Sequence, residues 1–288
     1  MKVIQINATC GIGSTGKIAV GISQLMSAEN IENYILCSRS DGYPLGISCA
    51  DSRYIRLQAL KSKILGNYGF NSKRATQRMI AELKRIKPDI VHLHNIHGHD
   101  CNLEMLFLYL REQKTKLIWT FHDCWAFTAY CPHYTMIKCD KWRFNCNQCK
   151  QLHEYSWFVD RGEELFERKK KLFEGMELTI VTPSQWLANI VKESFLKEYS
   201  VEVINNGIDL KIFKPTESDF RQINALERKK IVLGISFGWS ERKGFDVFID
   251  LARRLAGDYQ IILVGTDAAT DKLLPDNIMS IQRTQNQQ

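Results

Sequence analysis

A histidine, an aspartate and two cysteines lie at the end of an apolar run in residues 121–131, FHDCWAFTAYC. His122 follows a predicted strand at residues 116–121, and we expect it at the carboxyl end of that strand. An imidazole in this position can donate a hydrogen bond to a sugar hydroxyl or stabilise charge that develops during a reaction. The alternative is a core histidine whose ring is satisfied by a backbone carbonyl.

Four more histidines occur in residues 92–99, HLHNIHGH, and such a density of imidazoles could bind a metal ion. His92 and His94 are predicted to share one face of a strand, whereas His97 and His99 fall in the loop beyond it. No acidic fourth ligand accompanies them in a recognisable metal-site pattern. We therefore interpret them as buried-strand and loop histidines.

A glycine-rich turn, residues 10–18 with the sequence CGIGSTGKI, follows the first predicted strand and opens a predicted helix. Its spacing approaches the phosphate-binding P-loop, but Ile18 stands where a Ser or Thr would ligate magnesium, which disfavours an NTPase. Backbone N–H groups at a helix N-terminus can still bind an anion or a sugar hydroxyl. The alternative is a tight turn without a ligand.

Arg242 and Lys243 are adjacent cations at the start of another predicted helix, within residues 236–246. Fixed positive charge at a helix N-terminus can neutralise a diphosphate leaving group. A solvated pair of loop cations is the alternative.

Cysteines gather after His122 in an insertion at about residues 124–150, which has little helical or strand pattern. The closing Cys-x-x-Cys pair is a good half-site for tetrahedral zinc. Nine cysteines without a recognisable export signal disfavour a full disulfide framework. The sequence predicts one structural zinc ion, with buried free thiols or disulfides as alternatives; its ligands would be Cys131, Cys139, Cys146 and Cys149.

The elements that must position these residues alternate between strands and helices. Short apolar or β-branched runs predict strands at residues 3–6, 33–37, 89–93, 116–121, 179–181 and 201–204. Apolar stripes between them predict helices; the stripes are Ile18-Ile22-Leu25-Met26, Met79-Ile80-Leu83-Ile86 and Trp186-Leu187-Ile190-Val191. This order predicts an α/β fold with a doubly wound parallel sheet, which binds ligands at the carboxyl ends of its strands.

A polar stretch at residues 214–219 reads as a linker, and the strand and helix pattern restarts at residues 231–235. We therefore predict two Rossmann-like domains, residues 1–213 and an incomplete second domain, residues 214–288. In the second domain we expect an exposed apolar sheet face, formed by Ile231, Val232, Ile261, Ile262 and Leu263.

Composition indicates a globular chain of 288 residues, 44% of them hydrophobic, which is enough for sizeable cores. No apolar run reaches the length of a membrane helix, and the first seven residues are too short for a signal peptide, so we expect a cytoplasmic location. The net charge of +7 suggests an anionic partner.

Basic residues cluster at residues 61–87 and 168–171. They could hold the protein peripherally against anionic headgroups at the inner face of the membrane. Ordinary solvated helix faces are the alternative.

The chain resembles the retaining glycosyltransferases of glycosyltransferase family 4. The resemblance rests on an ordered set of motifs: GSTGKIA, DIVHLHN, TFHDCWAFT, VTPSQWLA, VINNGID followed by Phe213 and Pro215, and WSERKGFDVFIDLA. Enzymes of this family have two Rossmann-like domains, the GT-B fold. They transfer a sugar, commonly a hexose, from a nucleotide-sugar donor to glycan or lipid-linked acceptors in the synthesis of capsules and other cell-surface polysaccharides.

The resemblance implies a catalytic role for His122 at the transferred sugar, with no cofactor for the chemistry. The sequence contains no recognised nucleic-acid-binding motif, so we expect no nucleic-acid partner. The resemblance also implies donor or acceptor binding by Gly13, Ser14, Thr15, Gly16, Asn95, Arg242 and Lys243. Many members carry an arginine a few residues before the lysine; this chain has Trp239-Ser240 there, and Arg242 is the substitute.

The two glutamates that bind donor ribose and sugar in the family would lie beyond Gln288, so the resemblance implies a chain cut within its donor domain. We accordingly expect poor donor binding and no measurable transfer by this chain. A non-catalytic sugar- or nucleotide-binding module, or a zinc-dependent nucleic-acid-binding protein, are the alternative functions.

Overall fold

The computed structural model describes residues 1–113 and 115–283, which divide into two compact units, Met1–Gly207 and Ile208–Gln288. The sequence-based boundary after Phe213 falls inside the second unit, because residues 208–213 belong there together with the polar stretch that follows them.

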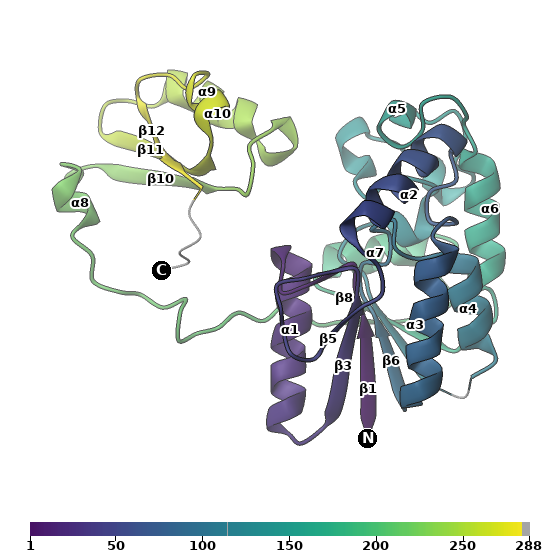
Figure 1. The fold of residues 1–288 in the computed structure, drawn as a ribbon. Helices are drawn as coiled ribbons and strands as arrows, with labels where there is room; N and C mark the ends of the chain where they lie inside the picture. The colour runs from purple at the N-terminus through teal and green to yellow at the C-terminus, as the bar shows by residue number, and fades with distance from the viewer. Residues whose placement is uncertain (114, 284–288) are drawn as a thin grey trace. The chain divides into compact units, whose positions relative to one another are not determined.

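A seven-stranded parallel sheet forms the centre of the first unit, with the strand order β5-β3-β1-β6-β7-β8-β9 (Figure 1). Its strands are β5 (Gly46–Ser48), β3 (Glu32–Cys37), β1 (Lys2–Ile6), β6 (Ile90–Leu93), β7 (Lys116–Thr120), β8 (Leu178–Thr182) and β9 (Ser200–Val203). A small parallel pair, β2 (Thr9–Cys10) and β4 (Arg39–Ser40), extends the loops after β1 and β3. The doubly wound parallel arrangement expected from the sequence is confirmed.

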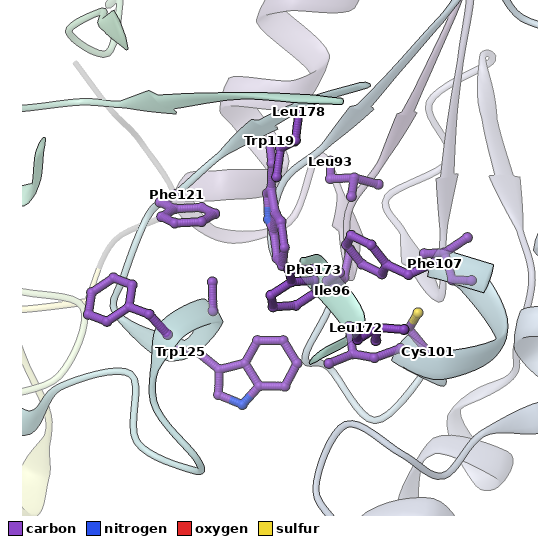
Figure 2. Close-up of a cluster of buried hydrophobic side chains, with 14 of the residues drawn as sticks. Leu93, Ile96, Cys101, Phe107, Trp119, Phe121, Trp125, Leu172, Phe173 and Leu178 are labelled. Carbon is purple, nitrogen blue, oxygen red and sulfur yellow. The ribbon is translucent and has the colours of Figure 1, made fainter. Parts of the chain in front are cut away.

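Helices connect the strands and cover the sheet. They are α1 (Gly13–Ala28), α2 (Ser52–Leu65), α3 (Lys73–Ile86), α4 (Leu103–Arg111), α5 (Leu152–Tyr155), α6 (Gly162–Phe173) and α7 (Gln185–Glu193). The cysteine-rich insertion contains three short 3-10 helices, η1 (Trp125–Phe127), η2 (Tyr134–Ile137) and η3 (Lys141–Arg143). The main core joins α3, α4, α6 and α7 to the sheet, and Figure 2 shows Phe107, Trp119 and Phe173 packed at its centre.

Two of the expected apolar stripes were partly wrong. In α1 the side chain of Leu25 is 70% exposed, and the buried residues are Gly16, Ala19 and Ser23. Small residues face inward there because α1 lies close against β2 and β3. Trp186 of α7 is exposed as well, whereas its neighbour Leu187 is buried.

The second unit contains a three-stranded parallel sheet, β10 (Lys230–Ile235), β11 (Tyr259–Thr266) and β12 (Ile278–Gln282). Its helices are α8 (Phe220–Ile223), η4 (Glu241–Lys243), α9 (Phe245–Arg254) and α10 (Ala268–Asp271). The expected exposed sheet face was wrong for Ile261, Ile262 and Leu263, which are buried. Ile261 and Leu263 form a core with Ala252 of α9, which covers this face of the sheet.

Candidate functional site

The candidate site lies at the carboxyl ends of β1, β6 and β7, which are neighbours in the sheet. The chain runs from β1 to β3 on one side and later returns to β6 on the other, so β1 and β6 flank the switch point of the sheet. Ligands of doubly wound folds bind at this kind of position. Asn95 and His122 lie in the loops that follow β6 and β7, whereas Gly13–Gly16 form the first turn of α1, after β1 and β2. The four predicted zinc ligands lie in the insertion after β7.

Hydrogen bonds tie the three loops together. The backbone N–H of Ala8 donates to the carbonyl of Asn95 at 2.8 Å, and the N–H of Asn95 donates to Asn7 Oδ1 at 3.1 Å. His122 in the loop after β7 contacts His94 in the loop after β6. Asn95 is therefore held through its backbone.

The glycine-rich turn depends on two glycines that no other residue could replace without strain. Gly11 has φ +73°, and a Cβ there would lie 1.9 Å from Asp41 Oδ2. A Cβ on Gly16 would lie 2.8 Å from Thr9 Oγ1, which donates to the carbonyl of Ile12. The turn thus needs glycine for its own packing.

Helix α1 begins at Gly13, and no side chain caps its N-terminus. Its N-cap residue is the apolar Ile12, and its first turn contains no acidic residue. These N–H groups and the positive end of the helix dipole therefore suit an anion or a hydroxyl. Gly13, Ser14, Thr15 and Gly16 form this first turn, as the sequence predicted.

A chain of hydrogen bonds runs from α1 to His122. Gln5 Nε2 donates to the carbonyl of Ala19 at 2.9 Å, which orients the amide of Gln5. Gln5 Oε1 lies 2.9 Å from His94 Nε2, and His94 Nδ1 lies 3.1 Å from His122 Nε2. Trp119 Nε1 donates to the carbonyl of His94 and fixes its backbone.

These contacts determine which ring nitrogens carry protons. Burial holds the pKa of His94 well below its usual value, so this ring is neutral. Its proton must lie on Nε2, because Gln5 Oε1 can only accept. His94 Nδ1 is then an acceptor, and His122 Nε2 must donate to it.

With Nε2 as the donor, the neutral ring of His122 has its lone pair on Nδ1. Burial lowers its pKa, the charge of Asp123 opposes this shift, and His97 adds to it. The sequence-based expectation that His122 donates a hydrogen bond to a sugar hydroxyl holds only for a protonated ring. In the neutral ring, Nδ1 accepts a hydrogen bond from the hydroxyl instead.

A second pair lies beside this chain. His97 Nε2 is 2.9 Å from Asp123 Oδ2, and the hydroxyl of Tyr68 donates to the carbonyl of His97 while its oxygen lies 3.2 Å from His97 Nδ1. Both ring nitrogens of His97 thus have polar partners, Asp123 and Tyr68. Burial alone would raise the pKa of Asp123. The charge and the hydrogen bond of His97 lower this pKa by more, so the net shift is downward.

His92 and His99 contact neighbouring side chains, and Nδ1 of His99 is buried without a hydrogen-bond partner. His92 Nε2 lies 2.8 Å from Thr120 Oγ1, and its ring packs against His94 with centroids 4.1 Å apart, as expected for two residues on one strand face. His99 packs against the ring of Tyr68. Burial lowers the pKa of His92 and of His99 to about 4.

Lys169 holds the backbone of residues 125–129, which follow His122 in the chain. Its side chain is fully buried, and Nζ donates to the carbonyls of Trp125, Thr128 and Ala129 at 2.7, 2.9 and 3.4 Å. The expectation of a solvated basic face at residues 168–171 is therefore wrong for Lys169. Burial holds its pKa well below the usual value, although nearby cysteines oppose the shift.

The four predicted zinc ligands line one pocket in the cysteine-rich insertion. Burial raises the pKa of Cys131 to about 12, and Cys146, Cys149 and Cys139 contribute to this shift, so the four thiols are near one another. Within residues 1–113 and 115–283, however, no three His, Cys, Asp or Glu side chains are arranged to hold a metal ion. The zinc site therefore stays a prediction, and all nine cysteines are free thiols.

Arg242 and Lys243 belong to the second unit, where they form the exposed 3-10 turn η4 after β10. Gly244, with φ +73°, joins this turn directly to α9. Both cations thus stand at the N-terminal end of a helix, as the sequence predicted.

Sequence reasoning missed Gln5, Asp123 and Lys169. Gln5 is a polar residue inside an apolar strand, which is a signal for a buried hydrogen bond. Lys169 lies at helical spacing from Leu165 and Leu172, so it falls on the apolar stripe of α6. Asp123 follows His122 directly and gave no separate signal.

Comparison with known proteins places this fold in a class of glycosyltransferases. The model of Glycosyltransferase Family 4 matches residues 17–212, well over half of the chain, and the chain belongs to this family. It is 22% identical over 228 residues to the colanic acid biosynthesis glycosyl transferase WcaC of Escherichia coli K12. That match covers 73% of this chain, which spans 55% of the length of WcaC.

Solved structures show the same GT-B fold. Sucrose-phosphate synthase from Thermosynechococcus elongatus matches with a TM-score of 0.61 at 13% identity, over 98% of this chain and 70% of that one. HepE of Anabaena in complex with UDP-glucose matches with a TM-score of 0.57 at 14% identity, over 100% and 70%. WaaG, a glycosyltransferase involved in lipopolysaccharide biosynthesis, matches with a TM-score of 0.56 at 14% identity, over 98% and 70%.

Among the described residues, no helix combines the length and apolar character that a membrane crossing requires.

Proposed function

We propose that this chain is the acceptor-side domain and part of the donor domain of a retaining glycosyltransferase of polysaccharide biosynthesis. The enzyme would move a sugar, most simply a hexose, from a nucleotide-sugar donor to a glycan or lipid-linked acceptor at the inner face of the membrane. Family membership and the match to WcaC support the reaction class. HepE, a structural neighbour, binds UDP-glucose, which supports a nucleotide-sugar donor.

The observation that carries the proposal is the placement of His122 at the carboxyl end of β7, with its Nε2 proton committed to His94. The bond between the sugar C1 and the diphosphate oxygen breaks, and its electron pair leaves with the diphosphate. The acceptor hydroxyl oxygen bonds to C1, and its proton leaves with the departing phosphate. His122 Nδ1 would orient the sugar through a hydroxyl, which strengthens contacts at the transition state.

Negative charge develops on the departing diphosphate, and cations or helix N-termini stabilise such charge. The N-terminus of α1 in the first unit and the pair Arg242 and Lys243 in the second unit offer these groups. The proposal assigns diphosphate binding to them.

Two measurements test the proposal. Isothermal titration with UDP and UDP-glucose should detect binding to a longer polypeptide that contains this chain and only poor binding to the 288-residue chain. Lys243→Ala should weaken binding to the longer polypeptide by about tenfold or more, as loss of a charged hydrogen bond does. The exposed Lys272→Ala is the matched control. Radiolabelled transfer is then measured with a panel of UDP- and GDP-sugars, using this chain and a longer polypeptide that contains it.

Product carrying the donor's anomeric configuration, formed by the wild type and not by His122→Ala, supports the proposal. Nucleotide-sugar binding without turnover in either polypeptide would favour a non-catalytic binding module. Inverted product would refute the retaining reaction.

A further inference from the structure

Helix α7 begins with an exposed tryptophan that the core does not use. Trp186 is 56% exposed, the largest exposed fraction among the six tryptophans of the chain. Its neighbours Leu187 and Ala188 are buried, and so are Ile190 and Val191 one turn later. Because residues three and four apart share one face of a helix, Trp186 falls on the outward face of α7. Tryptophan is highly buried on average, so packing does not explain an indole in this place.

The pairing of the strands puts this helix beside the candidate site. Strand β7 pairs in parallel with β8, and the backbone N–H of Phe121 donates to the carbonyl of Val181 at 2.8 Å. The two chains therefore leave the sheet side by side, one toward His122 and the other toward Pro183. Neighbouring strands lie about 4.8 Å apart. Trp186, in the first turn of α7, thus lies one strand away from His122 at the same edge of the sheet.

Amide side chains flank the start of α7. Gln185 Nε2 donates to Asn189 Oδ1 at 2.8 Å, and both residues are exposed. In the loop after β9, Asn205 Nδ2 donates to the carbonyl of Pro183 at 2.8 Å, which ties this loop to the start of α7. Among the described residues these three side chains make no other hydrogen bond. One oxygen or nitrogen of each amide is therefore available to a ligand, and together they can both donate and accept.

The first two turns of α7 carry no charge. Apart from Trp186, their exposed residues are the two amides, and the charged residues Lys192 and Glu193 come in the last turn. The N-terminus of the helix is already capped, because Ser184 Oγ accepts from the backbone N–H of Leu187 at 3.3 Å. These features favour a neutral ligand over an anion.

An exposed indole beside uncharged amides matches the chemistry of a sugar ring. The C–H groups on one face of a pyranose pack against an indole, and its hydroxyls donate and accept hydrogen bonds as amides do. Ligand sites of this kind combine aromatic side chains with a few polar groups that fix orientation. Nucleic acid or an anionic bilayer would instead require cations, which the first two turns of α7 lack.

We propose that Trp186, with the amides of Gln185, Asn189 and Asn205, forms a subsite for an uncharged sugar ring of the acceptor glycan. The inference deepens the proposed function and rests on it for the assignment to the acceptor, because the proposed diphosphate-binding cations belong to the second unit. Binding of a sugar at this subsite requires neither donor nor turnover. Its failure and the failure of transfer are therefore measured separately.

Saturation-transfer difference NMR tests the proposal with the 288-residue chain and neutral methyl hexopyranosides of the gluco, galacto and manno series. The wild type should bind at least one of them. Trp186→Ala should weaken this binding by about fivefold or more, because an aromatic contact is lost, and Trp186→Phe should keep most of it. Trp157→Ala, at the other strongly exposed tryptophan, is the matched control and should bind as the wild type does.

A second pair of variants tests the amides. Gln185→Ala/Asn189→Ala should weaken binding, whereas Lys192→Ala, in the last turn of the same helix, should not. Circular dichroism melts check that each variant folds. The proposal is overturned if no glycoside binds the wild type, if Trp186→Ala binds as the wild type does, or if only Trp157→Ala loses binding.

Competition with the donor distinguishes the two possible sources of the sugar ring. The NMR measurement is repeated on a longer polypeptide that contains this chain, with UDP-glucose in excess. Binding of the methyl glycoside should persist and should still depend on Trp186. Displacement of the glycoside by UDP-glucose would assign the ring to the donor and overturn the acceptor subsite.

Discussion

His94 Nδ1 lies 3.1 Å from His122 Nε2, and the two rings stack at an angle of 18°. This contact makes the protonation of His122 depend on a residue of another strand loop, and through His94 on Gln5 of β1. A histidine at the end of a strand thereby acquires a fixed tautomer, with Nε2 as donor and Nδ1 as acceptor. The orientation of the Gln5 amide follows from the carbonyl of Ala19, which accepts a hydrogen bond from Gln5 Nε2 and cannot donate one.

We predict that His122→Ala, made in a longer polypeptide that contains this chain, lowers kcat for glycosyl transfer by roughly a hundredfold or more, because a group that acts at the reacting sugar is lost. The melting temperature should change little. His153→Ala, at an exposed histidine of α5, is the control and should leave kcat unchanged. An unchanged rate combined with a collapsed melting temperature would make His122 a core histidine.

The tautomer of His122 should depend on Gln5. In Gln5→Met, His94 Nε2 loses its acceptor, so His94 can place its proton on either nitrogen and His122 is no longer obliged to donate from Nε2. We expect kcat to fall about tenfold or more with little change in KM, as loss of a transition-state interaction does. Nitrogen-15 spectra of the imidazoles report the tautomer directly.

Gln5→Glu is the matched variant, because burial keeps its carboxyl group protonated. The neutral carboxyl group donates to the carbonyl of Ala19 and accepts from His94, as the amide does, so it should retain the Nε2–H form of His122. Spectra of Gln5→Met that match those of the wild type would show that something other than Gln5 fixes the rings.

The sequence predicted the sheet well, because buried parallel strands are short apolar runs and helices between them leave little freedom of topology. It also placed His122 and the turn at Gly13–Gly16 at the carboxyl edge. It could not reveal that Gln5, His94 and His122 form one chain, since their partners come from three strands far apart in sequence. The sequence pattern also misplaced Lys169. A lysine within a basic run is expected to be solvated, unless its helical spacing from Leu165 and Leu172 is taken into account.

Lys169→Met should destabilise the first unit. The substitution leaves the carbonyls of Trp125, Thr128 and Ala129 buried without their donor, and such losses cost roughly 2–4 kcal/mol. In a unit of this size we expect the melting temperature to fall by about 5–15 °C. Lys170→Met, at the exposed neighbour, should have little effect in the same calorimetric measurement. Equal melting temperatures for both variants would contradict the structural role of Lys169.

Zinc binding by Cys131, Cys139, Cys146 and Cys149 remains a prediction that one measurement decides. Their shared pocket would have to tighten for the thiolates to meet a common ion at about 2.3 Å. Native mass spectrometry of protein purified without chelator should show one zinc per chain, absent from Cys146→Ser/Cys149→Ser. Cys37→Ser, at a buried cysteine in a separate core, is the control. A bare polypeptide mass with four freely alkylated thiols would exclude the site.

Stability should fall as the pH drops from about 6.5 to about 4. Burial lowers the pKa of His92 and of His99 to about 4 in the folded protein, whereas an unfolded histidine has a pKa of about 6.5. Between these values the unfolded chain binds more protons, so unfolding becomes easier with each step down in pH. Each histidine should contribute on the order of 3 kcal/mol of lost stability by pH 4.

The carboxylate of Asp123 affects the stability of the protein in a different pH range. Its folded pKa is lowered, so its contribution persists above about pH 3.9 and disappears only as the pH falls through the lower folded value. Loss of stability between pH 6.5 and 4 therefore reports the histidines.

In urea titrations across this range, His92→Asn should show a shallower decline than the wild type, because this site no longer takes up a proton on unfolding. The exposed His153→Asn should decline as steeply as the wild type. A flat wild-type profile, or the same slope in His92→Asn, would show that His92 does not carry this pH dependence.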